Sequence, residues 1–203
     1  CPECYDVGFS FIRDERGYRY ARPCHICGPL RTRIQRFNDA HIPSLYANKT
    51  LENLEPGHVP NSNLPEIRGY LWRWSQGYTP GDQGFLLVGV PGCGKTHAMV
   101  GVLRTLTLDK GITARFVEFT HLLSALRTEY DHGRGDAAIV GSVIDVDVLA
   151  IDELGKGADN DWQRSVLDEL ITKRYNHGKT TIFTTNYPLK DTNPLTNRDI
   201  HQN

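Results

Sequence analysis

The sequence contains no long apolar run, no secretion signal, no internal repeat and almost no methionine. No apolar segment approaches the roughly 18 residues that a membrane-spanning helix needs. The N-terminus lacks the charged and then apolar pattern of a secretory leader. We therefore expect a cytoplasmic protein with no membrane partner. The single methionine is not the first residue, so we expect a fragment or an ordered portion of a longer chain.

The length of 203 residues and the apolar share of 39% fit one ordinary core with a small appendage. The net charge of -1 hides an asymmetry, because residues 1–36 contain seven arginines against four acidic residues. Such a basic segment permits contact with nucleic acid or an acidic partner. It is equally compatible with a solvated arginine surface, and both interpretations stay open.

Four of the five cysteines form two C-x-x-C pairs, Cys1 with Cys4 and Cys24 with Cys27. The 19 residues between the pairs fall within the spacing of a structural zinc site, in which four thiolates bind one ion tetrahedrally. Disulfides do not fit a cytoplasmic protein, and a redox motif needs only one pair. His25 is an alternative ligand that we expect to be solvated. The pattern predicts bound Zn²⁺.

Between the cysteine pairs, residues 7–23 alternate apolar or aromatic with polar side chains on both sides of a glycine turn, which predicts a β-hairpin. Gly8 and Gly28 stand where a residue without Cβ lets backbone amides approach sulfur. We therefore predict a zinc ribbon, in which the metal folds the segment and has no catalytic role.

Composition divides the chain into three parts. Residues 1–36 form the predicted zinc ribbon, residues 37–63 a linker rich in Asn, Pro and Gly, and residues 64–203 an α/β domain. Within the last part we expect a helix that begins after an Asn63 cap and tolerates Pro65 in its first turn.

From residue 85 onward, short apolar strands alternate with amphipathic helices. The predicted strands are 85–89, 114–119, 147–152 and 180–186, and the predicted helices are 95–106, 121–130 and 161–175. Such alternation predicts a parallel sheet with helices on both faces. Ligands of this architecture bind at the carboxyl ends of the strands.

Residues 89–96, GVPGCGKT, match the phosphate-binding pattern G-x-x-x-x-G-K-[ST] between a strand and a helix. Glycines let backbone amides point at phosphate oxygens, and the helix N-terminus adds positive potential. We expect Lys95 to reach the β- and γ-phosphates and the Thr96 hydroxyl to bind Mg²⁺. Cys93 serves as a small residue or as an oxidisable thiol. The predicted nucleotide-binding residues are Gly89, Pro91, Gly92, Cys93, Gly94, Lys95, Thr96 and His97.

Residues 147–153, DVLAIDE, place two carboxylates at the end of a buried strand. We expect Asp152 to hold Mg²⁺ and Glu153 to orient and polarise the attacking water, which is a requirement of hydrolysis. Asn186 ends the next strand and would touch the γ-phosphate if that strand lies between the other two, although Asn before Tyr-Pro is also ordinary turn chemistry. The predicted catalytic residues are therefore Glu153, Lys95 and Asn186.

The segments GVPGCGKTHAM, DVLAIDELG and DWQRSVLDELITKRYNHGKTTIFTTNYPL resemble, in order and spacing, the DnaC/DnaI bacterial helicase loaders and the transposition ATPase IstB. The likeness covers roughly residues 24–190. It implies an AAA+ fold of strand order 5-1-4-3-2, with ATP as the nucleotide and Asn186 as sensor 1. The arginine finger and sensor 2 of the family lie beyond this sequence, so Arg198 receives neither role and the chain alone should hydrolyse ATP poorly.

The resemblance further implies an ATP-dependent loader of a hexameric replicative helicase. In that interpretation the zinc ribbon grips the helicase, and the AAA+ domain is an ATP and single-stranded DNA switch that self-assembles. An IstB-like ATPase assisting a transposase is the nearest alternative. A small-molecule phosphotransferase and a zinc-bearing module that binds ATP without turnover are others. Arg174 is either a packing residue or a functional one.

Overall fold

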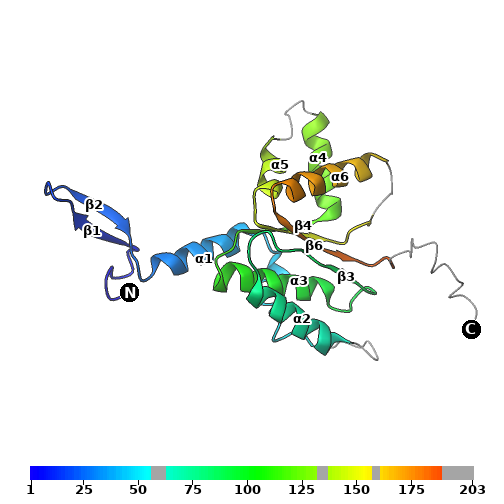
Figure 1. Ribbon diagram of the computed structural model, residues 1–203, viewed down its shortest axis with the longest axis horizontal. Helices are drawn as coiled ribbons and strands as arrows, with labels where there is room; N and C mark the ends of the chain where they lie inside the picture. Colours follow the sequence, from blue (N-terminus) through cyan, green and yellow to red (C-terminus); the bar gives the residue numbers. More distant parts are fainter. Residues whose placement is uncertain (56–62, 132–136, 157–160, 189–203) are drawn as a thin grey trace, which may run out of the picture.

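The computed structural model describes residues 1–55, 63–131, 137–156 and 161–188. It consists of an N-terminal hairpin and an α/β core, joined by one long helix (Figure 1). Among the helices of these residues, none has the length and apolar character required to cross a membrane.

The hairpin pairs β1 (Phe9–Arg13) with β2 (Arg19–Pro23) in antiparallel register. The Asp14 carboxylate closes the turn by accepting hydrogen bonds from the backbone amides of Arg16, at 3.0 Å, and Tyr18, at 2.8 Å. Gly17 has φ +82°, a left-handed conformation that glycine adopts without steric cost. The predicted hairpin around a glycine turn is confirmed.

Helix α1 (Gly28–Asp39) starts directly after the fourth cysteine and runs to the core (Figure 1). It continues through residue 36, where the sequence places the end of the zinc ribbon. Its C-terminal half is anchored to the core, since the Arg33 side chain donates to the Asp109 carbonyl at 3.1 Å and the Phe116 amide donates to the Ala40 carbonyl at 2.8 Å. A short helical turn, η1 (Ser44–Tyr46), follows.

The core sheet has the strand order β3-β6-β5-β4, and all neighbouring strands are parallel. The strands are β3 (Leu86–Val88), β4 (Ala114–Glu118), β5 (Val148–Asp152) and β6 (Thr180–Thr185). Numbered along the core, this is the order 1-4-3-2 that the resemblance implies, without a fifth strand among the described residues. The strand that leads to Asn186 therefore lies between the strand of the phosphate loop and the strand of Asp152.

Helices cover both faces of the sheet (Figure 1). One face carries α2 (Leu64–Gly77), α3 (Lys95–Arg104) and the π-helical turn η2 (Thr105–Asp109), and the other carries α4 (Phe119–Asp131), α5 (Ala137–Ile144) and α6 (Asp161–Asn176). Successive residues of β5 alternate between the two cores: Val148 and Ala150 pack in the first, Leu149 and Ile151 in the second. Because β5 is buried on both faces, its sequence is a continuous apolar run, and this run was the pattern that predicted the strand.

Three details differ from the sequence predictions. Helix α3 ends at Arg104 and continues as the π-helical turn, two residues before its predicted end. Asn63 occupies the N-cap position of α2, but its side chain makes no capping hydrogen bond. Helix α5 was not predicted, because its sequence AAIVGSVI has no polar face and thus no helical periodicity.

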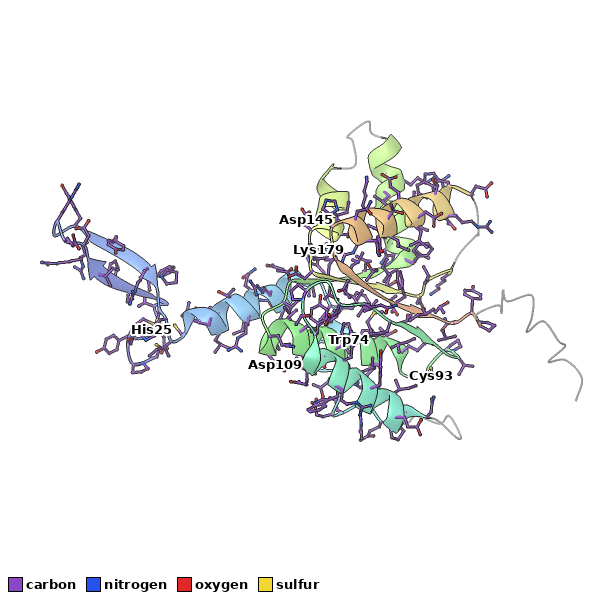
Figure 2. All side chains as sticks on the ribbon, viewed as in Figure 1. His25, Trp74, Cys93, Asp109, Asp145 and Lys179 are labelled. Carbon is purple, nitrogen blue, oxygen red and sulfur yellow. The ribbon has the colours of Figure 1, made fainter. Side chains whose placement is uncertain are left out.

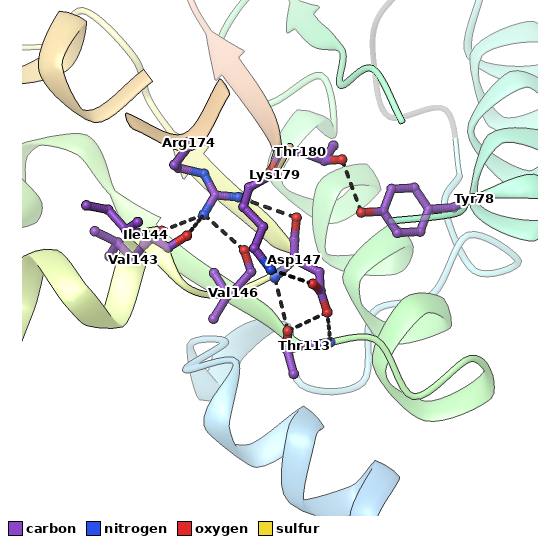
Figure 3. A network of polar contacts seen from close by, with 9 residues as sticks. All are labelled: Tyr78, Thr113, Val143, Ile144, Val146, Asp147, Arg174, Lys179 and Thr180. Carbon is purple, nitrogen blue, oxygen red and sulfur yellow. Dashed lines mark hydrogen bonds and ion pairs between the residues drawn. The ribbon is translucent and has the colours of Figure 1, made fainter. Parts of the chain in front are cut away.

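Arg174 of α6 is fully buried and fixes the end of α5 (Figure 3). Its guanidinium donates to the carbonyls of Val143, at 2.6 Å, Ile144, at 2.9 Å, and Val146, at 3.0 Å. Burial lowers the pKa of Arg174 to about 10. All of these partners belong to the fold, so Arg174 is a packing residue.

Candidate nucleotide and zinc sites

The phosphate loop occupies residues 89–94, between β3 and α3. Gly92 and Gly94 have φ of 79° and 95°, which a residue with a Cβ would adopt only under strain. Gly94 is the N-cap of α3, so the first free amides of that helix follow it directly. The loop therefore has the backbone that an anion-binding helix N-terminus requires.

Lys95 lies inside this loop. Its ammonium group donates to the carbonyls of Gly89, at 2.7 Å, and Val90, at 2.9 Å, and lies 3.7 Å from the Cys93 sulfur. A Cβ on Gly89 would lie only 2.8 Å from that sulfur. Cys93 thus fills the loop as a small residue, which is one of its two predicted roles. The carbonyls of Gly89 and Val90 hold the Lys95 ammonium where phosphate oxygens would approach.

Thr96 and Asp152 come together from α3 and β5. The Thr96 hydroxyl lies 2.9 Å and 3.1 Å from the two carboxylate oxygens of Asp152, which is only 5% exposed. The Thr184 hydroxyl, from β6, also donates to this carboxylate. Hydroxyl and carboxylate oxygens are ligands that Mg²⁺ prefers, so these residues fit the predicted magnesium site.

Glu153 follows β5 with φ +56°, a left-handed conformation that is uncommon outside glycine. Its amide donates to the Thr184 hydroxyl at 3.0 Å, and its carboxylate pairs with Lys156 at 2.5 Å. The hydrogen bond to Glu153 raises the pKa of Lys156. The Glu153 side chain is 31% exposed, so it stays accessible to water while Lys156 holds it.

Asn186 directly follows β6 and is half-buried. The preceding residues join the two neighbouring loops, because the Thr185 carbonyl accepts from the Gly89 amide at 3.3 Å and the Thr184 carbonyl accepts from the Leu154 amide at 2.8 Å. Asn186 therefore starts at the strand end that separates the phosphate loop from the Asp152 loop. Its contact with a γ-phosphate stays a prediction.

Sequence reasoning missed Thr184, which links Asp152 to the Glu153 backbone. The strand β6 reads TTIFTT, so Thr184 is one of four threonines in it, and threonine is common in strands for its β-branched shape alone. The contact depends on β6 lying beside β5, which no local pattern encodes.

His97 faces the segment that precedes α2, not the phosphate loop. Its Nε2 lies 2.9 Å from the Thr50 carbonyl and 2.8 Å from the Asn53 side-chain oxygen. A Cβ on Gly101 would lie 2.8 Å from the Leu51 amide nitrogen, so glycine allows this segment to pack closely on α3. The predicted role of His97 in nucleotide binding would thus act through the position of residues 50–53.

The four cysteine sulfurs lie within 4.8 Å of one another and come from both ends of the hairpin. Cys1 and Cys24 approach to 3.6 Å and Cys4 and Cys27 to 3.4 Å. In a tetrahedral ZnS₄ site the sulfurs would be about 3.8 Å apart, so the cluster fits zinc.

Of the two glycines expected to bring a backbone amide to a sulfur, Gly8 does so and Gly28 does not. The Gly8 amide donates to the Cys4 sulfur at 3.3 Å, as expected. The Gly28 amide bonds the Cys24 carbonyl at 2.7 Å instead of a sulfur, because α1 begins there. His25 pairs with Glu3 at 2.9 Å and its side chain is 61% exposed, which agrees with its expected solvation.

Comparison with known proteins finds a family of ATP-binding proteins and relatives among the bacterial helicase loaders. The family described as IstB-like ATP binding protein matches residues 36–197. The replicative helicase loader DnaC of Escherichia coli K12 is 23% identical over 166 residues, which are 80% of this chain and 66% of DnaC. The chain thus spans about two thirds of the length of this relative. The uncharacterized protein YdaV of the same strain is 30% identical over 94 residues, or 46% of this chain and 38% of YdaV.

Solved structures extend the comparison. A crystal structure of the DnaC helicase loader matches with a TM-score of 0.65 and 32% identity, over 74% of this chain and 83% of that one. DnaI matches with a TM-score of 0.58 and 21% identity, over 73% and 74% of the two chains. AMPPCP-bound DnaA from Aquifex aeolicus shares the fold, with a TM-score of 0.53 and 17% identity over 69% and 42% of the chains.

Proposed function

Because the chain belongs to the family of IstB-like ATP-binding proteins, we propose that it is an ATP-dependent loader of a hexameric replicative helicase onto DNA. The observation that carries this proposal is the 32% identity to the DnaC helicase loader across 83% of that chain. The relative DnaC of Escherichia coli K12, which matches 80% of this chain, is also a replicative helicase loader. An IstB-like role beside a transposase has only the family description in its support.

ATP binding would use the loop that already surrounds Lys95. The ammonium would leave the carbonyls of Gly89 and Val90 and bond the β- and γ-phosphates, while the amides that begin α3 face the same anion. Thr96 and Asp152 would hold Mg²⁺, which would shield the phosphate charge.

Hydrolysis would depend on Glu153 and Asn186. Glu153 would accept a proton from the attacking water once its carboxylate is free of Lys156. Asn186 would contact the γ-phosphate from the neighbouring strand end. We expect turnover to rise when DNA, the helicase or self-assembly through the ATPase domains supplies groups that the described residues do not contain. Arg198, which is not assigned a role here, lies outside them.

The zinc module, proposed as residues 1–36, would grip the helicase, with residues 37–63 as linker and residues 64–203 as the AAA+ switch for ATP and single-stranded DNA. Residues 56–62 of that linker lie outside the described part of the chain. A candidate partner surface lies in the first half of α1, where Leu30 and Ile34, four residues apart, are 50% and 45% exposed. Apolar residues four apart lie on one side of a helix, so they would form a stripe against which a protein partner could pack.

The proposal is tested by co-purification of the zinc-loaded chain with the replicative helicase of its host, followed by ATPase measurement on that complex. We expect Lys95→Ala to abolish ATP binding and Glu153→Gln to retain binding but lose turnover. An unchanged rate for Glu153→Gln in the presence of DNA and helicase would refute the assignment of the catalytic carboxylate. Co-purification of a transposase in place of the helicase would favour the IstB-like role.

A further inference from the structure

One face of the zinc hairpin carries exposed aromatic rings. The register pairs Phe9 with Pro23 and Phe11 with Ala21, and residues opposite one another point to the same face of a sheet. Phe9 is 51% and Phe11 is 59% exposed. Because proline and alanine are too small to cover a phenyl ring, both rings lie open to solvent on this face.

The same face carries two arginines without a counter-charge. Arg13 lies directly opposite Arg19, an arrangement of like charges that destabilises a strand pair. No carboxylate lies within ion-pair distance of either arginine in the part of the chain that the structure describes. Asp14, next to Arg13, accepts hydrogen bonds from turn amides. The two cations therefore leave room for an anion from outside the chain.

Arginine and ring also contact each other. The Arg19 guanidinium lies 4.8 Å from the centre of the Phe11 ring. A guanidinium in this position presents its edge to phosphate oxygens while the ring keeps one side for a planar group. All seven positive side chains of residues 1–36 are arginine, the residue suited to bidentate phosphate contacts.

We infer that this face, formed by Phe9, Phe11, Arg13 and Arg19 and called here the hairpin face, binds single-stranded DNA. Phe9 and Phe11 lie two residues apart on one strand, about 7 Å, which lets each ring stack on its own base. The arginines bond the phosphates between those bases. A duplex keeps its bases stacked inside, so the rings select a single strand.

The hairpin face is separate from the ATP site. The hairpin lies at the far end of α1 from the sheet, and Figure 2 shows His25, beside the hairpin, and Cys93, in the phosphate loop, on opposite sides of the core. The face also differs from the α1 stripe proposed for the helicase. The inference therefore goes beyond the proposed function, and its failure leaves that function intact.

The test of the arginines measures the affinity of the zinc-loaded chain for a fluorescent oligo(dT) by anisotropy, without ATP. Arg13→Gln with Arg19→Gln should weaken binding at least tenfold. It should also reduce the slope of log affinity against log salt by about 1.4, the value for two lost single-strand phosphate contacts. The matched control, Arg16→Gln with Arg22→Gln, removes the same charge from the turn and from the opposite face of β2. Equal losses in both pairs would overturn the inference.

The test of the rings uses Phe11→Ala, which should weaken binding roughly 5- to 150-fold, the range for one lost base stack of about 1–3 kcal/mol. Tyr20→Ala, on the opposite face, is its control and should change affinity less than twofold. Zinc content of one ion per chain verifies folding of each variant. An oligonucleotide with 5-iodouracil should cross-link to the peptide that contains Phe9 and Phe11.

Three further outcomes would contradict the inference. Cross-links confined to residues 63–188, or wild-type affinity of Phe11→Ala, would overturn it. Loss of helicase co-purification with full oligonucleotide affinity in the same variants would reassign the face to a protein partner.

Discussion

Replacing Thr184 with valine isolates the contact that joins the Asp152 carboxylate to the backbone of Glu153 in the candidate ATPase site. Valine keeps the β-branched shape but removes the hydroxyl, which donates to the Asp152 carboxylate and accepts from the Glu153 amide at 3.0 Å. Thr184 is only 1% exposed, so water cannot replace these bonds. Asp152 would lose a donor, and the Glu153 backbone would lose the acceptor that fixes it.

The expected loss of stability in Thr184→Val follows from the two hydrogen bonds that the hydroxyl makes. A hydrogen bond to a charged group contributes about 1.5–3 kcal/mol, and a buried unpaired amide costs about 1–3 kcal/mol. Partial relaxation should leave a loss of about 2–4 kcal/mol in the free energy of unfolding. Because Glu153 would also shift relative to the water that we propose it activates, we expect turnover to fall about 10- to 100-fold.

Thr180→Val is the matched control. Thr180 lies on the same strand, is 2% exposed and also makes two bonds, donating to the Asp82 carbonyl at 2.6 Å and accepting from Tyr78 at 3.1 Å. Thr180 is the first residue of β6, four residues before Thr184 and at the opposite end of the strand from the candidate site. We expect a comparable loss of stability without a loss of turnover.

The assay combines urea unfolding with ATPase rates at a temperature where all variants are folded, in the presence of DNA and helicase. Thr184→Ser should restore both stability and turnover, since serine keeps the hydroxyl. Wild-type turnover of Thr184→Val, or an equal loss in Thr180→Val, would refute the role of Thr184 as the positioning residue of Glu153.

Three other perturbations test the fold and the zinc site. Gly101→Ala should lower the free energy of unfolding by about 1–3 kcal/mol, because its Cβ would lie 2.8 Å from the Leu51 amide nitrogen. Gly141→Ala should be neutral or stabilising, because among the described residues its Cβ would meet no atom outside its own helix backbone within 4 Å. Urea unfolding compares the two variants. Burial would raise the pKa of Asp147, but its ion pair with Lys179 and its bonds from Thr113 hold that pKa below 3.8. A depressed carboxyl pKa stabilises the fold above pH 3.8, so the stability advantage of wild type over Asp147→Asn should be constant above about pH 5 and shrink as the pH falls toward the folded-state pKa; a constant difference down to pH 2 would contradict this. Removal of zinc by a chelator should abolish hydrogen-exchange protection in residues 9–23 while the core sheet stays protected, and a metal-free but protected hairpin would refute the ribbon.

The sequence predicted those parts of the site that are local. Gly92 and Gly94 belong to one loop whose positive φ angles favour glycine, and Lys95 follows directly as the first residue of α3. Each cysteine pair lies within four residues of the chain. The parallel sheet followed from apolar runs such as the one at β5, which is buried on both faces.

Several contacts that the sequence did not predict join distant segments. Thr184 bonds Asp152 only because β6 and β5 are neighbours, and His97 bonds Thr50 across 47 positions of the chain. Arg174 looks like an ordinary helix-end cation until α5 brings three carbonyls to it. Partners of this kind depend on the tertiary packing, which single-residue propensity and periodicity do not contain.

The most direct test of the central claim is delivery of the host's hexameric replicative helicase onto closed circular single-stranded DNA. The amount of helicase bound to the circle is measured with the wild-type chain, with Lys95→Ala and with no loader. The account predicts that the wild-type chain with ATP raises the bound helicase well above the level without loader, and that Lys95→Ala does not. Equal delivery by wild type and Lys95→Ala, or none by either, would contradict an ATP-dependent helicase loader.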